Sequence, residues 1–354
     1  KTLTNVLYEN NNTLSVLNNF LAGQAELFDE LSNATDITVL APSNDALNQL
    51  ADDSELMDAM ATDEGLIAAF LKYHVFQGVY FSSNFTTAPQ SAPVMVQTLM
   101  NASAYTNVTG GQRVQANADG SGAITFVSGM GNSASVRSGD YNFTGGTIHI
   151  VDGVLTIPSN VTETLINANL TAAVGALKRA KLIDSVDGED EITVFAPDNA
   201  AFNAVGSVVS GMTSSELASI MGYHIIRGKV LYTAAMSNGT ETTSEGNDVR
   251  IRMEEDGGIF VNSAKIVRRN LLTSNGVVHV CDNVLNPENE SATPNPTAAT
   301  QKPAFSGAEA TNSVPFTSGV KTPNPTTSKV VTATVTAAGP VGSGASAPAQ
   351  VAAA

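Results

Sequence analysis

Basic residues, cysteine and long apolar runs are all scarce in this chain of 354 residues. Lysine and arginine number 17 against 33 aspartates and glutamates, so the formal net charge is −16. Without a basic stripe the chain is poorly suited to displace counterions from nucleic-acid phosphates, and its charge opposes docking on an anionic membrane surface. The sequence contains no run of about 18 apolar residues, the length expected of a membrane-spanning helix. The single cysteine, Cys281, excludes an intramolecular disulfide framework and a multi-cysteine metal site.

The last part of the chain, residues 288–354, differs in composition from everything before it. It is rich in Thr, Pro, Ala, Ser and Gly, and its three acidic residues are balanced by three lysines. Such a segment buries too little apolar surface to offset the entropy of ordering, which predicts an extended, disordered stalk. Its Ser/Thr/Pro content is typical of O-glycosylated stalks, and a plain flexible linker is the alternative.

Two further features favour an extracellular protein. The first residue is Lys1, from which we expect that a secretion signal has been removed. The chain also has ten Asn-x-Ser/Thr sequons, against roughly six expected by chance, and any that carry a glycan must lie on the surface of a secreted protein. These candidate N-glycosylation sites are Asn11, Asn33, Asn84, Asn101, Asn107, Asn142, Asn160, Asn169, Asn238 and Asn289.

Three sequence blocks recur in the same order, and this internal repeat is the main signal in the chain. The paired blocks are TVLAPSNDAL (38–47) and TVFAPDNAAF (193–202), YHVFQG (73–78) and YHIIRG (223–228), and IHIVDGVL (148–155) and VHVCDNVL (278–285). The repeat predicts two copies of one domain, residues 1–157 and 158–287. The first copy has 20 extra residues between its second and third blocks.

The blocks also predict local structure. Residues 37–40 and 192–195 are short apolar runs rich in β-branched residues, which predicts buried strands that end at the following proline. The polar side chains after each proline are suited to capping a helix. Upstream, apolar residues at helical spacing predict an amphipathic helix over 14–31 and a second one over 170–186. Helices followed by strands and hairpins predict an α+β domain in each copy.

Together the three blocks resemble the fasciclin domain, whose pattern runs from T-V-F-A-P-x-N-x-A-F through a central Tyr-His to N-G-x-I-H-x-[IV]-D-x-V-L. Residues 274–279 match the closing segment closely, whereas the first copy has Gly145-Gly146-Thr147 in place of the Asn-Gly turn and Leu40 and Leu47 in place of Phe. The resemblance covers nearly all of residues 1–287, and the tandem with its tail is similar to fungal surface members. It implies compact wedges of β-strands with packed helices, and a role in adhesion or in matrix or wall association, without a shared catalytic activity.

All four histidines lie within the repeated blocks. Tyr73-His74 and Tyr223-His224 are candidate adhesive residues, because the resemblance implies an integrin-directed surface at this pair; the alternative is a half-buried structural pair. His149 and His279 each precede an aspartate by three positions, which in a strand sends the two side chains to opposite faces. Both are therefore predicted to be structural. No Arg-Gly-Asp sequence occurs, which argues against direct integrin recognition. Because no positioned nucleophile is found either, no catalytic residue is predicted, and no cofactor-binding or metal-binding residue is predicted.

These patterns lead to the hypothesis of a secreted, non-enzymatic cell-surface or cell-wall glycoprotein that acts in adhesion or extracellular-matrix association. A carbohydrate- or lipid-binding surface module is the alternative. The expected partners are wall, matrix or cell-surface components, without nucleic acid, and with the membrane only through a glycosylphosphatidylinositol (GPI) anchor, for which residues 342–346 supply small residues. Residues 1–157 carry a net −11 and residues 158–287 a net −5, which favours the first copy as the contacting domain.

Overall fold

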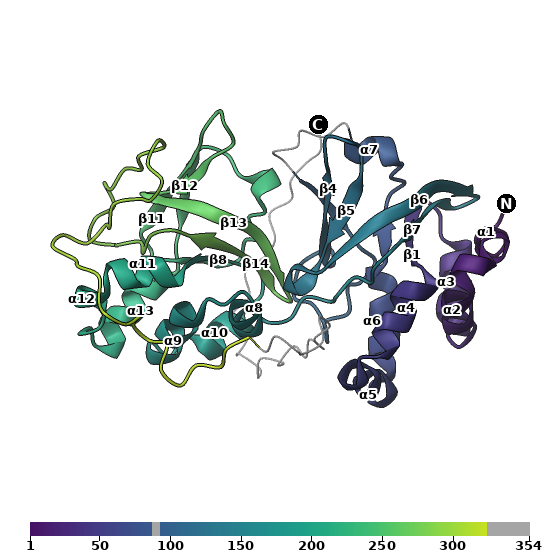
Figure 1. The fold of residues 1–354 in the computed structure, drawn as a ribbon, viewed down its shortest axis with the longest axis horizontal. Coiled ribbons are helices and arrows are strands. Elements are labelled where there is room, and N and C mark those ends of the chain that lie inside the picture. Colours follow the sequence, from purple (N-terminus) through teal and green to yellow (C-terminus); the bar gives the residue numbers. More distant parts are fainter. Residues whose placement is uncertain (87–92, 324–354) are drawn as a thin grey trace, which may run out of the picture.

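The computed structural model describes residues 1–86 and 93–323 and shows two domains side by side (Figure 1). The helices of the first domain are α1 (Leu3–Glu9), α2 (Asn11–Ala22), α3 (Ala25–Asn33), α4 (Asn44–Ala51), α5 (Ser54–Thr62), α6 (Glu64–Tyr73), α7 (Ser82–Thr86) and the 3-10 turn η1 (Gly129–Gly131). Its strands are β1 (Ile37–Pro42), β2 (Val75–Gln77), β3 (Val94–Gln97), β4 (Arg113–Ala118), β5 (Ile124–Val127), β6 (Ser133–Phe143) and β7 (Gly146–Val151).

The second domain repeats this sequence of elements. Its helices are α8 (Val161–Asn167), α9 (Thr171–Arg179), α10 (Ile183–Gly188), α11 (Asn199–Ala204), α12 (Gly206–Val209), α13 (Ser214–Gly222) and the 3-10 turn η2 (Thr233–Ala235). Its strands are β8 (Ile192–Pro197), β9 (Ile225–Ile226), β10 (Gly239–Thr242), β11 (Asp248–Met253), β12 (Ile259–Val261), β13 (Ala264–Thr273) and β14 (Gly276–Cys281).

Each domain is built on one seven-stranded sheet with helices packed against it (Figure 1). The strand orders are β2-β1-β7-β6-β5-β4-β3 in the first domain and β9-β8-β14-β13-β12-β11-β10 in the second. The pairs β1–β7 and β8–β14 are parallel, and the other neighbours are antiparallel. The two α+β domains therefore share one topology, in agreement with the sequence repeat.

The first and third repeated blocks form the parallel strand pair of each sheet, β1 with β7 and β8 with β14. Every residue of β1 and β8 is buried, as their β-branched composition predicts. Each strand ends at its proline, and the next residues begin a helix: Ser43 Oγ accepts the Ala46 N–H at 3.3 Å, and Asp198 Oδ1 accepts the Ala201 N–H at 2.7 Å. These caps satisfy donors that the first turn of a helix leaves unpaired.

The predicted helices over 14–31 and 170–186 are each divided in two. The first is α2 and α3, separated at Gly23 and Gln24, and the second is α9 and α10, with Lys181 in the left-handed region at φ 59°. The break changes the direction of the chain, so that Leu21 of α2 and Leu27 of α3 both reach the core. Apolar spacing continues across such a break, which is why the pattern did not reveal it.

The structure differs from the predicted stalk over residues 288–323, which we call the C-terminal strap. The strap contains turns but no helix or strand, and its apolar residues from Phe305 to Val320 pack against the helical core cluster of the second domain. Phe305 is 8% exposed within the core cluster, and Phe316 packs against it from outside. A few apolar side chains are enough to hold an extended segment when the domain has sites that receive them. The average composition of the segment does not reveal such docking. The rest of the predicted stalk, residues 324–354, lies outside the described residues.

Candidate functional site

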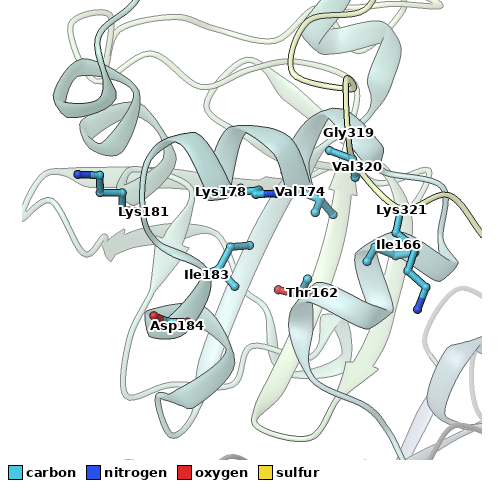
Figure 2. Close-up of a pocket in the computed structure, with 10 residues that line it drawn as sticks. All are labelled: Thr162, Ile166, Val174, Lys178, Lys181, Ile183, Asp184, Gly319, Val320 and Lys321. Atoms are coloured by element: carbon cyan, nitrogen blue, oxygen red, sulfur yellow. The ribbon is translucent and has the colours of Figure 1, made fainter.

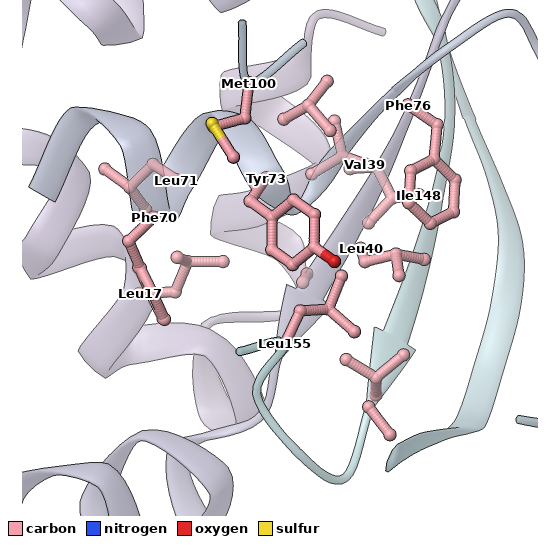
Figure 3. Close-up of a cluster of buried hydrophobic side chains, with 14 of the residues drawn as sticks. Leu17, Val39, Leu40, Phe70, Leu71, Tyr73, Phe76, Met100, Ile148 and Leu155 are labelled. Atoms are coloured by element: carbon pink, nitrogen blue, oxygen red, sulfur yellow. The ribbon is translucent and has the colours of Figure 1, made fainter. Parts of the chain in front are cut away.

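The first Tyr-His pair lies where helix α6 meets strand β2, inside the first domain. Tyr73 has no exposed surface, its ring lies among Met100, Leu40 and Leu155 (Figure 3), and its hydroxyl donates to the Arg113 carbonyl at 2.9 Å. His74 is 3% exposed, and its Nδ1 lies 2.8 Å from the Phe70 carbonyl oxygen. Its Nε2 accepts the Leu155 N–H at 2.8 Å. The ring therefore fastens the end of helix α6 to the segment that follows β7.

The second pair makes the same contacts in the second domain. The Tyr223 hydroxyl donates to the Asp248 carbonyl at 2.8 Å, and both Tyr223 and His224 have no exposed surface. His224 Nδ1 lies 2.8 Å from the Ile220 carbonyl oxygen, and its Nε2 accepts the Leu285 N–H at 2.9 Å. In both domains the bonding pattern requires a neutral ring with its proton on Nδ1. These four candidate adhesive residues are thus turned away from any partner at the surface.

Burial keeps both rings uncharged. It lowers the pKa of His74 and of His224 to about 4, because a charged imidazolium would lose its hydration there. Burial likewise raises the pKa of Tyr73 and Tyr223 above the usual value of a phenol. Neither pair is therefore suited to exchange protons near neutral pH.

The other two histidines hold the chain segment that follows β2 and β9. His149 Nε2 lies 2.8 Å from the Tyr80 carbonyl oxygen, and His279 Nε2 lies 2.8 Å from the Leu231 carbonyl oxygen. Both side chains have no exposed surface. The domains differ at the second ring nitrogen: His279 Nδ1 accepts the Asn270 N–H at 3.3 Å, whereas His149 Nδ1 lies 4.0 Å from Asp140 Oδ1.

The aspartates that follow these histidines by three positions bond elsewhere. Asp152 Oδ1 accepts the Ser135 N–H, and Asp282 Oδ1 accepts the Lys265 N–H, both at 2.7 Å. Burial raises the pKa of the Cys281 thiol, which disfavours the reactive thiolate. No group of three metal-ligating His, Cys, Asp or Glu side chains is found within residues 1–86 and 93–323. The histidine, aspartate and cysteine side chains of the repeated blocks therefore form hydrogen bonds with the backbone or are buried, and these are structural roles.

A polar interface between the domains was missed by reasoning from the sequence. Gln112 has no exposed surface, and its Nε2 donates to the Thr273 carbonyl at 2.9 Å. Asn107 N–H donates to the Ser274 carbonyl at 2.8 Å, and Asn270 Nδ2 donates to Gln115 Oε1 at 2.9 Å. The interface joins the β3–β4 edge of the first domain to the β13–β14 hairpin of the second. Most of its residues lie outside the repeated blocks, so the pattern offered little signal for them.

The candidate glycosylation sites differ in their exposure. Three are half-buried: Asn107 in the interface, Asn160 at the start of α8, and Asn289, whose Nδ2 donates to the Ala304 carbonyl at 2.9 Å. The exposed ones are Asn11, Asn33, Asn84, Asn101, Asn142, Asn169 and Asn238. Within the part of the chain that the structure describes, no helix is long and apolar enough to cross a membrane.

Comparison with known proteins identifies the family. The fasciclin-domain model matches residues 12–158 and 168–287. The chain is 34% identical over 311 residues to a fasciclin-like arabinogalactan protein of Arthroderma benhamiae, covering 88% of this chain and 72% of the relative. It is 30% identical over 277 residues to one from Cercospora beticola, covering 77% and 73% respectively. Among solved structures, a FAS1 domain pair from the insect cell adhesion molecule Fasciclin I aligns with a TM-score of 0.40 at 20% identity, covering 80% of this chain and 99% of that chain. The two family matches coincide with the two repeated domains, and the chain belongs to the fasciclin family.

Proposed function

We propose that the protein is a secreted, non-enzymatic glycoprotein that acts in adhesion or in cell-wall or matrix association. The observation that carries this proposal is the inward orientation of the repeated Tyr and His side chains and of the single Cys281. They form hydrogen bonds or pack within the two domains, and this leaves the outer surface, rather than a reactive cleft, for a partner to contact. The relatives include proteins named fasciclin-like arabinogalactan proteins, and these names support a role of this kind.

The helical side of the first domain is the surface that we propose makes the contact. Its segment from α3 to α6 carries exposed carboxylates and a single basic side chain, Lys72, which pairs with Glu30 at 2.9 Å. An acidic surface attracts cationic groups over distances comparable with the Debye length. The exposed acidic residues are Glu26, Asp29, Glu30, Asp36, Asp45, Asp52, Asp58 and Glu64. The proposed partner is therefore a wall or matrix component that presents positive charge.

A cell-attachment assay with charge-neutralised protein tests this proposal. We expect a variant with Glu26→Gln, Asp29→Asn and Asp58→Asn to support weaker attachment than the unchanged protein, with the difference shrinking at high salt. The matched control neutralises three acidic residues of the second domain, Glu254→Gln, Glu255→Gln and Asp256→Asn. Equal attachment by all three proteins, or failure of the unchanged protein to support any attachment, would contradict the proposal.

Location and anchoring need a separate experiment in the native host. We expect surface labelling to reach the protein on intact cells. Release by a phospholipase specific for glycosylphosphatidylinositol would support the anchor hypothesis, and an unmodified C-terminus would exclude it. A protein found only inside the cell would overturn the proposed function.

A carbohydrate-binding module is the second candidate, and one groove favours it. Helices α1, α2 and α3 enclose a groove of about 210 Å³ that is lined in part by Tyr8, Phe28, Asn11 and Asn18. Tyr8 is 77% exposed, and an exposed aromatic face beside amide groups can stack on a sugar ring and hydrogen-bond its hydroxyls. Saturable binding of a wall glycan that is lost in Tyr8→Ala would favour this candidate over adhesion by charge.

A further inference from the structure

The second domain has a cavity whose wall is completed by the C-terminal strap. Its volume is about 460 Å³, within the range of about 300–1,000 Å³ that small-molecule sites occupy. Side chains from α8, α9 and α10 form one side, and residues 319–321 of the strap form the other (Figure 2). The cavity therefore depends on the strap being docked.

Specific contacts hold the strap in this position. The Phe316 ring lies edge-on to the Phe202 ring with centroids 5.9 Å apart, and the Arg179 guanidinium lies 5.6 Å from the Phe316 ring centroid. The Phe316 carbonyl lies so close to Gly175 of α9 that a Cβ there would collide with it. These contacts lie only three residues before Gly319, so they position the wall of the cavity directly.

The lining of the cavity combines an apolar surface with a basic rim. Ile166, Val174 and Ile183 lie between the lysines in Figure 2, and Val320 faces them from the strap. The rim carries three lysines, Lys178, Lys181 and Lys321, against one carboxylate, Asp184. This excess of positive charge occurs in a chain with 17 basic and 33 acidic residues.

The lysines are only weakly neutralised by their neighbours. Lys321 Nζ lies 3.6 Å from Glu163 Oε2 with 69% of its side chain exposed, which makes this a weak ion pair. Lys178 and Lys181 form no ion pair with any residue in the described ranges. Lys178 lies in the last turn of α9, where the helix dipole favours a cation, but Lys321 belongs to no helix. The dipole alone therefore does not account for the basic rim.

We propose that this cavity binds an amphiphilic carboxylate, with its apolar body against Ile166, Val174 and Ile183 and its carboxylate at the lysine rim. A purely hydrophilic anion would leave the apolar lining without a partner, and a neutral lipid would make no charge-assisted contact with the lysines. The strap forms one wall of the site, because it supplies both Val320 and Lys321. This site is independent of the acidic surface of the first domain.

Calorimetric titration of the full chain with dodecanoate, below its micellar concentration, tests the proposal. We expect saturable binding at one site, and a Kd at least about tenfold higher in Lys178→Gln/Lys321→Gln, since two charge-assisted contacts are lost. The matched control is Lys302→Gln, which removes an exposed lysine of the same strap outside the cavity and should leave the Kd unchanged. Dodecyltrimethylammonium, with the same apolar chain and the opposite charge, should not bind.

A second variant tests the role of the strap. Phe316→Ala removes the contacts with Phe202 and Arg179, and we expect weaker dodecanoate binding with circular dichroism unchanged, because the wall of the cavity is released. Absence of saturable dodecanoate binding to the unchanged protein would overturn the proposal. Equal binding of the cationic amphiphile, or an equal loss of affinity in Lys302→Gln, would overturn it as well.

Discussion

Three of the four histidines, His74, His224 and His279, act as neutral cross-links within the backbone framework. His74 and His224 each bond a helix carbonyl through Nδ1 and a distant N–H through Nε2. His279 bonds the Leu231 carbonyl and the Asn270 N–H in the same two-sided manner. A neutral imidazole is both a donor and an acceptor, and no other side chain of this rigid shape can serve both bonds. The recurrence of histidine in the repeat is thus explained by architecture.

This arrangement predicts a loss of stability in mild acid. Burial lowers the pKa of His74, His224 and His279 to about 4, whereas the unfolded chain has the ordinary value of about 6.5. The unfolded state therefore binds more protons as the pH falls. The stabilisation is fully present above pH 6.5 and is lost progressively towards pH 4, at about 3 kcal/mol per histidine.

Denaturant unfolding from pH 7.5 to pH 4 measures this effect. The matched variant, His279→Gln, should be less stable at neutral pH and should show a shallower dependence on pH. A free energy of unfolding that stays constant between pH 7 and pH 4.5 would mean that the rings are not held neutral.

The exposure of the sequons predicts which of them carry glycans. We expect Asn101 to be occupied, because it is exposed and its Nδ2 makes no hydrogen bond within the described residues. Asn107 should be empty in the folded protein, since a glycan there would separate the domains, and Asn289 should be empty because its Nδ2 contacts the strap. Peptide mapping by mass spectrometry of protein from the native host measures occupancy. An occupied Asn107 in monodisperse protein would refute the interface as described.

Among the secondary-structure elements, each sheet depends on a glycine at the start of one of its two parallel strands, β7 or β14. A Cβ on Gly146 would collide with the Ile37 carbonyl oxygen, and a Cβ on Gly276 would collide with the Ile192 carbonyl oxygen. β1 and β7, and β8 and β14, approach each other closely at these points. The glycines of the Gly145-Gly146 and Asn275-Gly276 turns are therefore required by strand packing as well as by the turn.

Gly276→Ala is expected to lower the melting temperature by about 10 °C, because relieving the collision must separate two buried strands. The control is Gly188→Ala in the same domain, where an added Cβ meets no atom within 4 Å. It should leave the melting temperature unchanged or slightly raised, since alanine reduces the entropy of the unfolded chain. Thermal unfolding followed by circular dichroism distinguishes the two outcomes. Equal melting temperatures for both variants would show that the strands separate without cost.

At the scale of the whole molecule, the interface makes the tandem a single unit in this structure. Besides the polar contacts of Gln112, Asn107 and Asn270, Met95 packs against a small apolar cluster that contains Leu272 and Val277. Thr109 N–H also donates to Glu191 Oε1 at 3.1 Å across the boundary. Buried amides that find partners in the other domain fix the relative orientation, because any rotation would leave them unpaired.

Gln112→Ala is expected to weaken the coupling between the domains. It leaves the Thr273 carbonyl and the Arg113 N–H without their partner, at a cost of about 2 kcal/mol. Small-angle scattering should then show a larger radius of gyration, while each domain keeps its own fold. The control, Gln77→Ala, alters an exposed glutamine whose Nε2 donates to the Thr98 carbonyl within the first domain. Identical scattering from Gln112→Ala and the unchanged protein would show that the amide does not hold the domains together.

Local sequence patterns predict the two domains, their shared α+β class and the strands β1, β7, β8 and β14. Apolar periodicity, strand-ending prolines and helix-capping residues act locally, and an internal repeat can be recognised in the sequence without knowledge of tertiary contacts. The burial of Tyr73 and His74 follows from tertiary packing, because it depends on which segments pack over them. The docking of Phe316 on α9 and the pairing of Gln112 with the second domain also depend on tertiary packing. Those contacts join residues far apart in the chain, and no local pattern encodes them.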